Sequence, residues 1–396
     1  MQTSTHLKLS APGVYLQDIP SLPGKDLLTG VPVFLGVPKV NNSLNHSLPV
    51  PKMLTLWTQF VQYFQPLDDV QLHIFLDSYL ANAVRGFFEN GGRLCYFLHL
   101  PDNSLLALQN GLQAIESLDV IDLVCAPDIM QNPPTEVLEM QRAVLEHCDR
   151  MGDRFAILDA FNISNIEDIQ TLKEQQQGLI GDNAALYTPW LKTENASTDI
   201  PPCGHIAGIY ARNDAEVGVH RAPANYLLEG VLDLSILFTD ADWEILNAEI
   251  GAGVNCIRSF RSRGIRIWGS RTLSQNPEWQ YINIRRLKIT VLRWVERNLA
   301  DAIFEPNNID LWDRIVRELT VYCEFLWEKG AIHGDTPEEA FYVKCDAETN
   351  PAEIRNTGQI VTEIGLAPTA PSEFIVISLV HRSNGVKFVE VQSVES

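Results

Sequence analysis

Four apolar segments set the architecture of this chain: RLCYFLHL (93–100), VIDLVCA (120–126), FAILDAF (155–161) and AALYTPWL (184–191). Near-continuous apolar runs of this length are typical of strands that are buried on both faces. Longer amphipathic segments separate them, at Ser104–Leu118, Thr135–Met151 and Asn165–Gln177. Strands that alternate with helices predict a mainly parallel sheet with helices on its faces, here over residues 70–195.

Residues that favour helix N-caps precede these amphipathic segments. They are Asp102 or Ser104, Thr135, and Ser164 or Asn165. On the amino-terminal side, residues 31–37 read as a strand that Pro32 keeps near a sheet edge or at a strand start. We expect residues 21–69 to pack near the C-terminal domain.

On the carboxyl-terminal side, the polar stretch KTENASTDIPPCG (192–204) predicts a domain boundary, because it holds two consecutive prolines. An α+β domain is predicted over residues 200–380. Its expected strands are 254–260, 265–268, 341–345 and 373–379, and its expected helices are 282–300 and 309–327. A last alternating run, 386–391, follows a Ser-Asn-Gly turn.

Composition and charge exclude several classes of protein. The chain has 396 residues and a formal net charge of −20, which disfavours binding to nucleic acid and docking on anionic lipid. No apolar run is long enough to span a membrane, and MQTSTHLKLS at the start is no secretory signal. The seven cysteines form no Cys-x-x-Cys motif, so we predict reduced thiols, no zinc site and assembly in the cytoplasm.

Motifs of catalysis are weak throughout. Asp128 and Asp159 follow predicted strands, where carboxylates can act as bases, yet capping residues are common there. His333-Gly334-Asp335 and Cys203-Gly204-His205 are better explained as turns than as catalytic pairs. There is no Walker P-loop, GxGxxG, GxSxG or HExxH. We therefore predict no catalytic, cofactor or metal residue; the alternative is a soluble α/β metabolic enzyme that uses the 70–191 sheet.

Arginine and tryptophan are concentrated after residue 205. The arginines are Arg258, Arg261, Arg263, Arg266, Arg271, Arg285 and Arg286, and five tryptophans are interleaved with them between Trp268 and Trp327. This pairing is a signature of protein interfaces, and a basic face suits the acidic remainder of an identical copy. Self-assembly is therefore favoured over nucleic-acid binding.

A series of motifs then follows in one order along the chain: AGIYARNDAEVGVHRAPAN (207–225), GVNCIRSF (253–260), IRIWGSRTLS (265–274), WQYINIRRL (279–287), FEPN (304–307) and APTAPSEFIV (367–376). Together with APGVYLQDI (11–19), this series resembles the tail sheath proteins of contractile phages and the sheaths of contractile injection systems. The likeness is dense over residues 200–380 and looser over the α/β region.

The resemblance implies a structural subunit and no enzyme. Such sheaths stack as six-subunit rings around an inner tube, between a baseplate and a terminal cap, and shorten to drive the tube through a target envelope. The fold implied is an inserted α/β domain, a C-terminal α+β sheath domain and extended strand arms at residues 1–20 and 381–396. The particle is either released by lysis or anchored at a membrane through its baseplate. With no nucleotide motif, contraction would use free energy stored during assembly.

Two arms could add strands to the sheets of neighbouring subunits. Their predicted residues are Val14, Tyr15, Leu16 and Ile19 in the first arm, and Val386, Phe388, Val389 and Val391 in the second. The alternative is that both arms are edge strands of the subunit's own sheet. We also expect Arg258, Arg263, Arg266 and Arg271 at subunit or tube interfaces; the alternative is that several of them pair inside their own domain.

Overall fold

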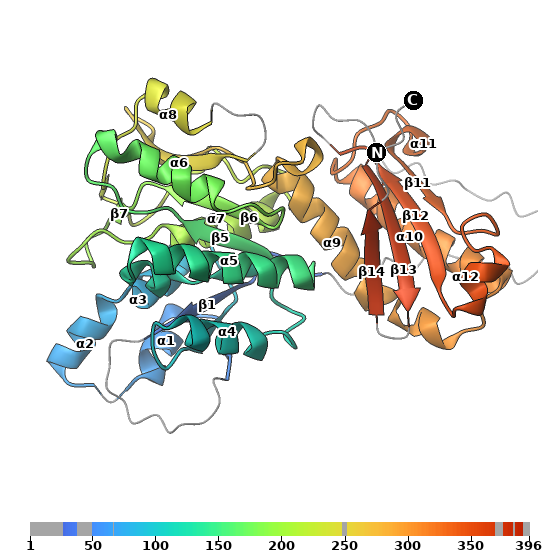
Figure 1. The fold of residues 1–396 in the computed structure, drawn as a ribbon, viewed down its shortest axis with the longest axis horizontal. Helices are drawn as coiled ribbons and strands as arrows, with labels where there is room; N and C mark the ends of the chain where they lie inside the picture. The colour runs from blue at the N-terminus through green and yellow to red at the C-terminus, as the bar shows by residue number, and fades with distance from the viewer. Residues whose placement is uncertain are drawn as a thin grey trace, which may run out of the picture.

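The computed structural model describes residues 27–37, 50–65, 67–247, 252–368, 375–382 and 385–390. These residues form two parts that lie side by side, an α/β part and a smaller C-terminal part (Figure 1). The long helix α9 (Ile282–Asn298) lies between their two sheets.

The α/β part is built on an eight-stranded sheet of order β10-β9-β6-β5-β4-β1-β3-β2. All neighbours from β9 to β3 are parallel, and the two edge strands β10 and β2 are antiparallel to theirs. The predicted mainly parallel sheet is thus confirmed, and the four apolar segments supply β3 to β6. The strands are β1 (Pro32–Gly36), β2 (Lys52–Leu54), β3 (Cys95–His99), β4 (Leu123–Cys125), β5 (Phe155–Asp159), β6 (Ala184–Thr188), β9 (Val254–Phe260) and β10 (Gly264–Trp268).

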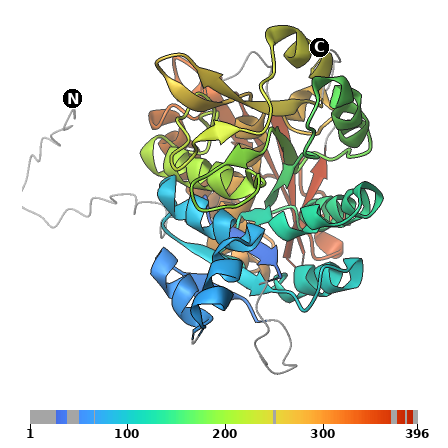
Figure 2. The ribbon, with the colours of Figure 1, turned by 90° about the vertical axis from the view of Figure 1, so that its left-hand side faces the viewer.

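Helices cover both faces of this sheet (Figure 2). In β1, Phe34 points to the face where it meets Phe87 of α3, with ring centroids 5.8 Å apart. Val33 and Leu35 point to the other face, into a cluster with α4 and α5. This period of two gives each face its own apolar core. One face carries α3 (Tyr79–Glu89) and α7 (Cys203–Glu216), and the other carries α4 (Leu105–Ala114), α5 (Pro134–Met151) and α6 (Ile169–Gln177).

The helix starts agree in part with the predicted N-caps. Ser104 caps α4, because its hydroxyl accepts a hydrogen bond from the Ala107 N–H at 3.1 Å. The predicted cap at Thr135 is wrong: α5 begins at Pro134, whose ring presets the first helical φ and which needs no N–H partner there. Asn165 precedes the short 3-10 helix η2 (Ile166–Asp168), without a side-chain cap bond.

The segment before residue 69 lies elsewhere than expected. We predicted that residues 21–69 pack near the C-terminal domain, but β1 lies inside the large sheet, between β4 and β3. Pro32 is tolerated because it is the first residue of that strand. Strand β2, α1 (Trp57–Tyr63) and α2 (Asp69–Leu76) continue the same part, and of the described residues in this segment Leu27 packs against the C-terminal core.

The predicted boundary at residues 192–204 is also corrected. Cys203 begins α7, which packs so closely on α3 that a Cβ on Gly204 would lie 2.3 Å from the Cα of Ala83. Strands β9 and β10 then add to the large sheet, and Ile257 and Ile267 share its core. Burial of their apolar face therefore places residues 254–268 with the α/β part.

The C-terminal part holds a four-stranded antiparallel sheet of order β11-β12-β13-β14. Helices α9 and α10 (Ile309–Glu328) pack beside it, and Trp294 stacks on Tyr322 with ring centroids 4.1 Å apart. Both long helices were predicted within two residues of these bounds. The remaining elements are β11 (Phe341–Lys344), β12 (Ile360–Leu366), β13 (Ile375–Arg382), β14 (Gly385–Glu390), α11 (Pro337–Ala340), α12 (Ala352–Asn356), η3 (Pro277–Trp279) and η4 (Ala300–Phe304).

Smaller elements complete the α/β part. They are the two-stranded sheet of β7 (Leu191–Lys192) and β8 (Asp233–Leu234), the helix α8 (Asp240–Leu246) and the 3-10 helix η1 (Pro127–Gln131). Within the ranges that the structure describes, no helix is both long and apolar enough to cross a bilayer.

Candidate assembly sites

A buried group of charges joins the two parts of the chain. Arg286 of α9 donates two hydrogen bonds to the carboxylate of Asp214 in α7, at 2.8 and 2.5 Å, and one to Asp122 at 2.9 Å. All three side chains are at most 4% exposed. Burial acts to lower the pKa of Arg286, but the facing carboxylates outweigh it and raise that pKa, so the guanidinium is charged.

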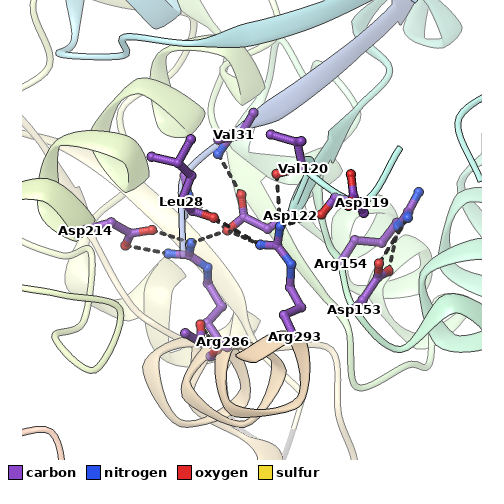
Figure 3. A network of polar contacts seen from close by, with 12 residues as sticks. Leu28, Val31, Asp119, Val120, Asp122, Asp153, Arg154, Asp214, Arg286 and Arg293 are labelled. Carbon is purple, nitrogen blue, oxygen red and sulfur yellow. Dashed lines mark hydrogen bonds and ion pairs between the residues drawn. The ribbon is translucent and has the colours of Figure 1, made fainter. Parts of the chain in front are cut away.

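Asp122 connects this group of buried charges to the large sheet. Its carboxylate accepts hydrogen bonds from the N–H groups of Gly30 at 2.9 Å and Val31 at 2.6 Å, directly before β1 (Figure 3). Gly30 has φ +71°, and a Cβ there would lie 2.5 Å from the Cα of Ala211 in α7. Only glycine fits this approach, so the lead into β1 runs tightly between α7 and the joint.

Arg293 extends the joint along α9. Its guanidinium donates to the carbonyl oxygens of Asp119 and Val120, each at 2.9 Å, just before β4 (Figure 3). We call the four side chains of Arg286, Arg293, Asp122 and Asp214 the charged joint. Removing one member of such a buried set leaves an uncompensated charge, which costs about 3–5 kcal/mol.

Sequence reasoning missed the charged joint. It grouped Arg286 with arginines expected at interfaces and singled out neither Arg293 nor the two aspartates. The missed signal is spacing: Ile282, Arg286, Ile289 and Arg293 recur at helical intervals, and all four are at most 5% exposed. Arginines in phase with the apolar face of a helix predict buried ion pairs with another element.

Three of the four predicted interface arginines, Arg258, Arg263 and Arg266, lie on the β9–β10 hairpin. Arg258 pairs with Asp240 at 2.6 Å, and Arg263 donates to the side-chain oxygen of Asn225 at 3.0 Å. Arg266 donates to the main-chain oxygen of Asn225 at 2.5 Å. Each therefore has a contact inside its own chain, while the hairpin itself is a sheet edge with partly exposed side chains.

Arg271 lies apart from that hairpin. It donates to the side-chain oxygen of Gln280 at 2.8 Å, and its guanidinium lies over the Tyr281 ring, 5.3 Å from the centroid. The structure thus brings Arg258, Arg263 and Arg266 together and leaves Arg271 beside α9. Whether any of the four contacts a neighbouring copy stays a prediction.

The C-terminal arm residues lie on an edge of the small sheet. Val386, Phe388 and Val389 belong to β14, which pairs with β13 of the same chain, as in the pair Ser378 and Val389. Val391 falls outside the described residues, as do Val14, Tyr15, Leu16 and Ile19 of the N-terminal arm. Exchange of either arm between subunits therefore stays a prediction.

Asp128 and Asp159, which were considered as catalytic candidates, accept structural hydrogen bonds from neighbouring segments. The Asp128 carboxylate accepts hydrogen bonds from the Val37 N–H at 2.9 Å and from Gln131 at 2.7 Å. Asp159 accepts one from the Cys203 N–H at 2.8 Å, at the start of α7, and burial raises the pKa of Asp159 to about 7. These contacts tie strand ends to the following elements.

The two Cys-His and His-Asp motifs carry no catalytic geometry either. Burial raises the pKa of the Cys203 thiol well above its usual value and lowers the pKa of His205 to about 4, so both groups are neutral. The main chain of His333 donates to the Ala367 oxygen at 2.7 Å, next to the antiparallel bridge between Ile332 and Pro368. Among the residues with described positions, no group of His, Cys, Asp or Glu could hold a metal ion.

Two family models match the chain in sequence. The phage tail sheath protein central domain matches residues 106–273, and the phage tail sheath C-terminal domain matches residues 274–381. The junction between them falls after β10, where the large sheet ends, which agrees with the corrected limit of the α/β part.

The curated relatives that match the chain are named as tail sheath proteins. A putative prophage major tail sheath protein of Pseudomonas aeruginosa (strain UCBPP-PA14) is 25% identical over 194 residues, which are 46% of this chain and 46% of the relative. The tail sheath protein of Escherichia phage P2 is 23% identical over 279 residues, 67% of this chain and 66% of the relative. The matched part of the chain therefore spans less than two thirds of these relatives.

Solved structures match almost the whole chain. One is the sheath complex of an extracellular contractile injection system, PVC, in its contracted state, which is 29% identical with a TM-score of 0.72. The match covers 93% of this chain and 97% of the PVC chain. The contracted helical sheath of the anti-feeding prophage is 28% identical with a TM-score of 0.73, at 93% and 98% coverage. The sheath tail protein Lin1278 of Listeria innocua, 10% identical with a TM-score of 0.65, shows the fold alone.

This chain belongs to the contractile tail sheath family. The resemblance seen in the ordered motifs is thereby confirmed. Proteins of this family are structural, and the comparisons give no support to the alternative of a metabolic α/β enzyme.

Proposed function

We propose that the chain is the subunit of a contractile sheath, which polymerises as stacked hexameric rings around an inner tube. Contraction of the sheath drives the tube through a target envelope. The observation that carries this proposal is the match of 93% of the chain to the contracted helical sheath of the anti-feeding prophage, with a TM-score of 0.73. A match over nearly the full length includes both parts of the fold.

The charged joint suits this task. A subunit that moves a long way within a lattice transmits force only if its two parts move together. We expect the two parts to move as one body, because Arg286 and Arg293 tie α9 to Asp122 and to the segments before β1 and β4. Motion is then confined to the contacts between subunits, because subunits can move as rigid bodies while the interfaces between them repack.

Strand exchange would hold moving subunits together. In the described chain β14 is the outer strand of its sheet, and it follows β13 after two residues. The same ladder of main-chain hydrogen bonds can form with β13 of a neighbour, since domain swapping exchanges identical elements. Val386, Phe388, Val389 and Val391 would then lie in a neighbour's sheet, and Val14, Tyr15, Leu16 and Ile19 would add a further strand.

The proposed partners follow from the same assembly. They are further copies of the chain, an inner tube protein, and baseplate and terminal cap proteins. A baseplate structure of the anti-feeding prophage, in which the matching chain is 29% identical with a TM-score of 0.72, supports a baseplate contact. Assembly would take place in the cytoplasm, before release by lysis or anchoring through the baseplate.

The direct test is expression of the full chain alone, followed by negative-stain microscopy of the purified protein. Long hollow tubes are expected. Deletion of residues 1–20 should give soluble monomers without tubes, because the first arm is then missing, and thermal unfolding of the same sample checks that the subunit still folds. If concentrated full-length protein stays as compact single particles, the proposal fails.

A further inference from the structure

A cavity of about 660 Å³ opens between the two parts of the chain, beside the charged joint. Its wall is mostly apolar, and it includes Leu28, Val217, Leu287, Trp294, Tyr322 and Leu326. Leu28 and Val217 are 53% and 47% exposed, so the mouth is apolar as well as the interior. An open apolar hollow of this size marks a docking site for a bulky side chain.

A matching projection lies at the turn between α9 and α10. Phe304 ends η4 and is 87% exposed, the highest exposure among the large apolar side chains of the described chain. Ile309, the first residue of α10, is 66% exposed. An aromatic side chain held out in water on a short turn gains free energy only when a partner covers it.

The charges around the two features are complementary. Asp301, Glu305 and Asp310 are exposed around Phe304, with Arg314 bridging the first two. The cavity lining carries exposed Arg93 and Lys329 against one exposed carboxylate, Glu216. In a contact between two copies, the acidic projection would meet a rim with an excess of one positive charge, which favours encounter in one orientation.

The projection and the cavity cannot meet within one chain. Phe304 precedes the first residue of α10, whereas Tyr322, Leu326 and Lys329 border the cavity at the other end of that helix. The helix between Ile309 and Tyr322, the first residue of α10 that lines the cavity, is about 20 Å long. We propose that Phe304 of one copy inserts into this cavity of the next copy. The contact rests on the proposed polymer, because it needs a second copy of the chain.

A contact of this kind is heterologous. A projection that fits a cavity elsewhere on the same molecule does not close a dimer, and it continues from copy to copy as a filament or ring. One aromatic anchor in a desolvated pocket can dominate the affinity of such an interface. Phe304 is therefore the specificity-determining residue of this contact, and the cavity gives it a defined register.

Cysteine cross-linking tests the contact in the full chain. Two variants, Phe304→Cys and Val217→Cys, are mixed before assembly and oxidised; all seven native cysteines are buried, so they do not compete. A disulfide-linked dimer is expected from the mixture and from neither variant alone. The control mixture pairs Phe304→Cys with Leu106→Cys, a residue of α4 that is 66% exposed, and should give no dimer.

A second measurement uses Phe304→Ser, which should raise the concentration needed for tube formation about tenfold to a hundredfold, as loss of a buried aromatic anchor does. Leu106→Ser should leave that concentration unchanged. Tubes without the specific cross-link overturn the contact and leave the sheath proposal standing. A cross-link without tubes supports the contact and refutes the sheath proposal. A cross-link that appears only after deletion of residues 1–26 assigns the cavity to that segment and overturns the contact.

Discussion

Arg286 of α9 donates a hydrogen bond to Asp122 at 2.9 Å, although the two residues are 164 positions apart in the sequence. Both side chains lie below 5% exposure, where a lone charge would be strongly disfavoured. Asp214 completes the set from the other side of the guanidinium. This pairing connects the part of the chain that holds the large sheet to the part that carries β11 to β14.

Loss of the Arg286 guanidinium should destabilise the folded chain. Arg286→Met is expected to lower the free energy of unfolding by about 3–5 kcal/mol, because it leaves Asp122 and Asp214 buried without their cation. Urea unfolding followed by circular dichroism measures the change. Arg314→Met is the matched control, since its ion pairs with Asp301 and Glu305 are at the surface and should contribute less than about 1 kcal/mol. Equal effects of the two substitutions would contradict the role given to the joint.

Asp159→Asn should flatten the pH dependence of stability between about pH 4 and 7. Burial raises the pKa of Asp159 from 3.8 to about 7, so in this range the folded chain holds a proton that the unfolded chain has lost. The folded state then binds more protons, and stability falls as pH rises through this range. Asparagine has no proton to lose and keeps an oxygen for the Cys203 N–H.

The melting temperature measured at intervals from pH 4 to pH 8 checks this outcome. Asp102→Asn is the control, because a hydrogen bond with Ser104 lowers the pKa of that exposed carboxyl and places its titration at more acid pH. A decline with pH that is as steep in Asp159→Asn as in the parent chain would refute the assignment.

Charge reversal on the β9–β10 hairpin should impair assembly without unfolding the subunit. Arg258→Glu, Arg263→Glu and Arg266→Glu change partly or fully exposed side chains, so the melting temperature should move little. Tube formation should need higher protein concentration and should become more sensitive to salt. Microscopy and light scattering follow assembly, with Arg142→Glu on α5 as a control outside the hairpin. Normal tubes with all three changes would remove the hairpin from the interface; Arg271→Glu tests the remaining arginine separately.

A disulfide between Ser378 and Val389 positions should report where β14 pairs. The two Cα positions are register partners in the β13–β14 ladder. If the arm exchanges between subunits, a chain with Ser378→Cys and Val389→Cys gives covalent ladders from oxidised tubes on a non-reducing gel. If the arm folds back, the same sample runs as a monomer. Oxidation of the dilute, unassembled protein provides the reference for the folded-back state.

Removal of β14 should separate folding from assembly. A chain that stops after Arg382 keeps β13 paired with β12 through a long register from Ile360 to Leu366, so the subunit should remain folded. Tubes should be lost, because the second arm is gone. Thermal unfolding and microscopy of the same sample distinguish this result from simple misfolding, and tubes of normal length would contradict the arm hypothesis.

Local patterns were enough to predict the secondary structure around the large sheet. Near-continuous apolar runs predict β3 to β6, and Ser104 marks the start of α4, because these signals act over a few residues. Pro201 and Pro202 led to a wrong prediction of a domain boundary at residues 192–204, because prolines that precede a helix look in sequence like prolines in a linker. β9 joins the large sheet by pairing with β6, as in the pair Leu186 and Val254, and no local pattern predicts a pairing between segments so far apart.

The sequence by itself determined the class of fold and, through the order of its motifs, the family of the protein. Only the tertiary structure decided that β1 lies inside the sheet, that Arg286 and Arg293 are buried, and that Phe304 and the apolar cavity lie at opposite ends of α10. The physical reason is range. Hydrophobic period and capping are local, whereas burial of a charge or exposure of an aromatic ring depends on which distant segments pack against it.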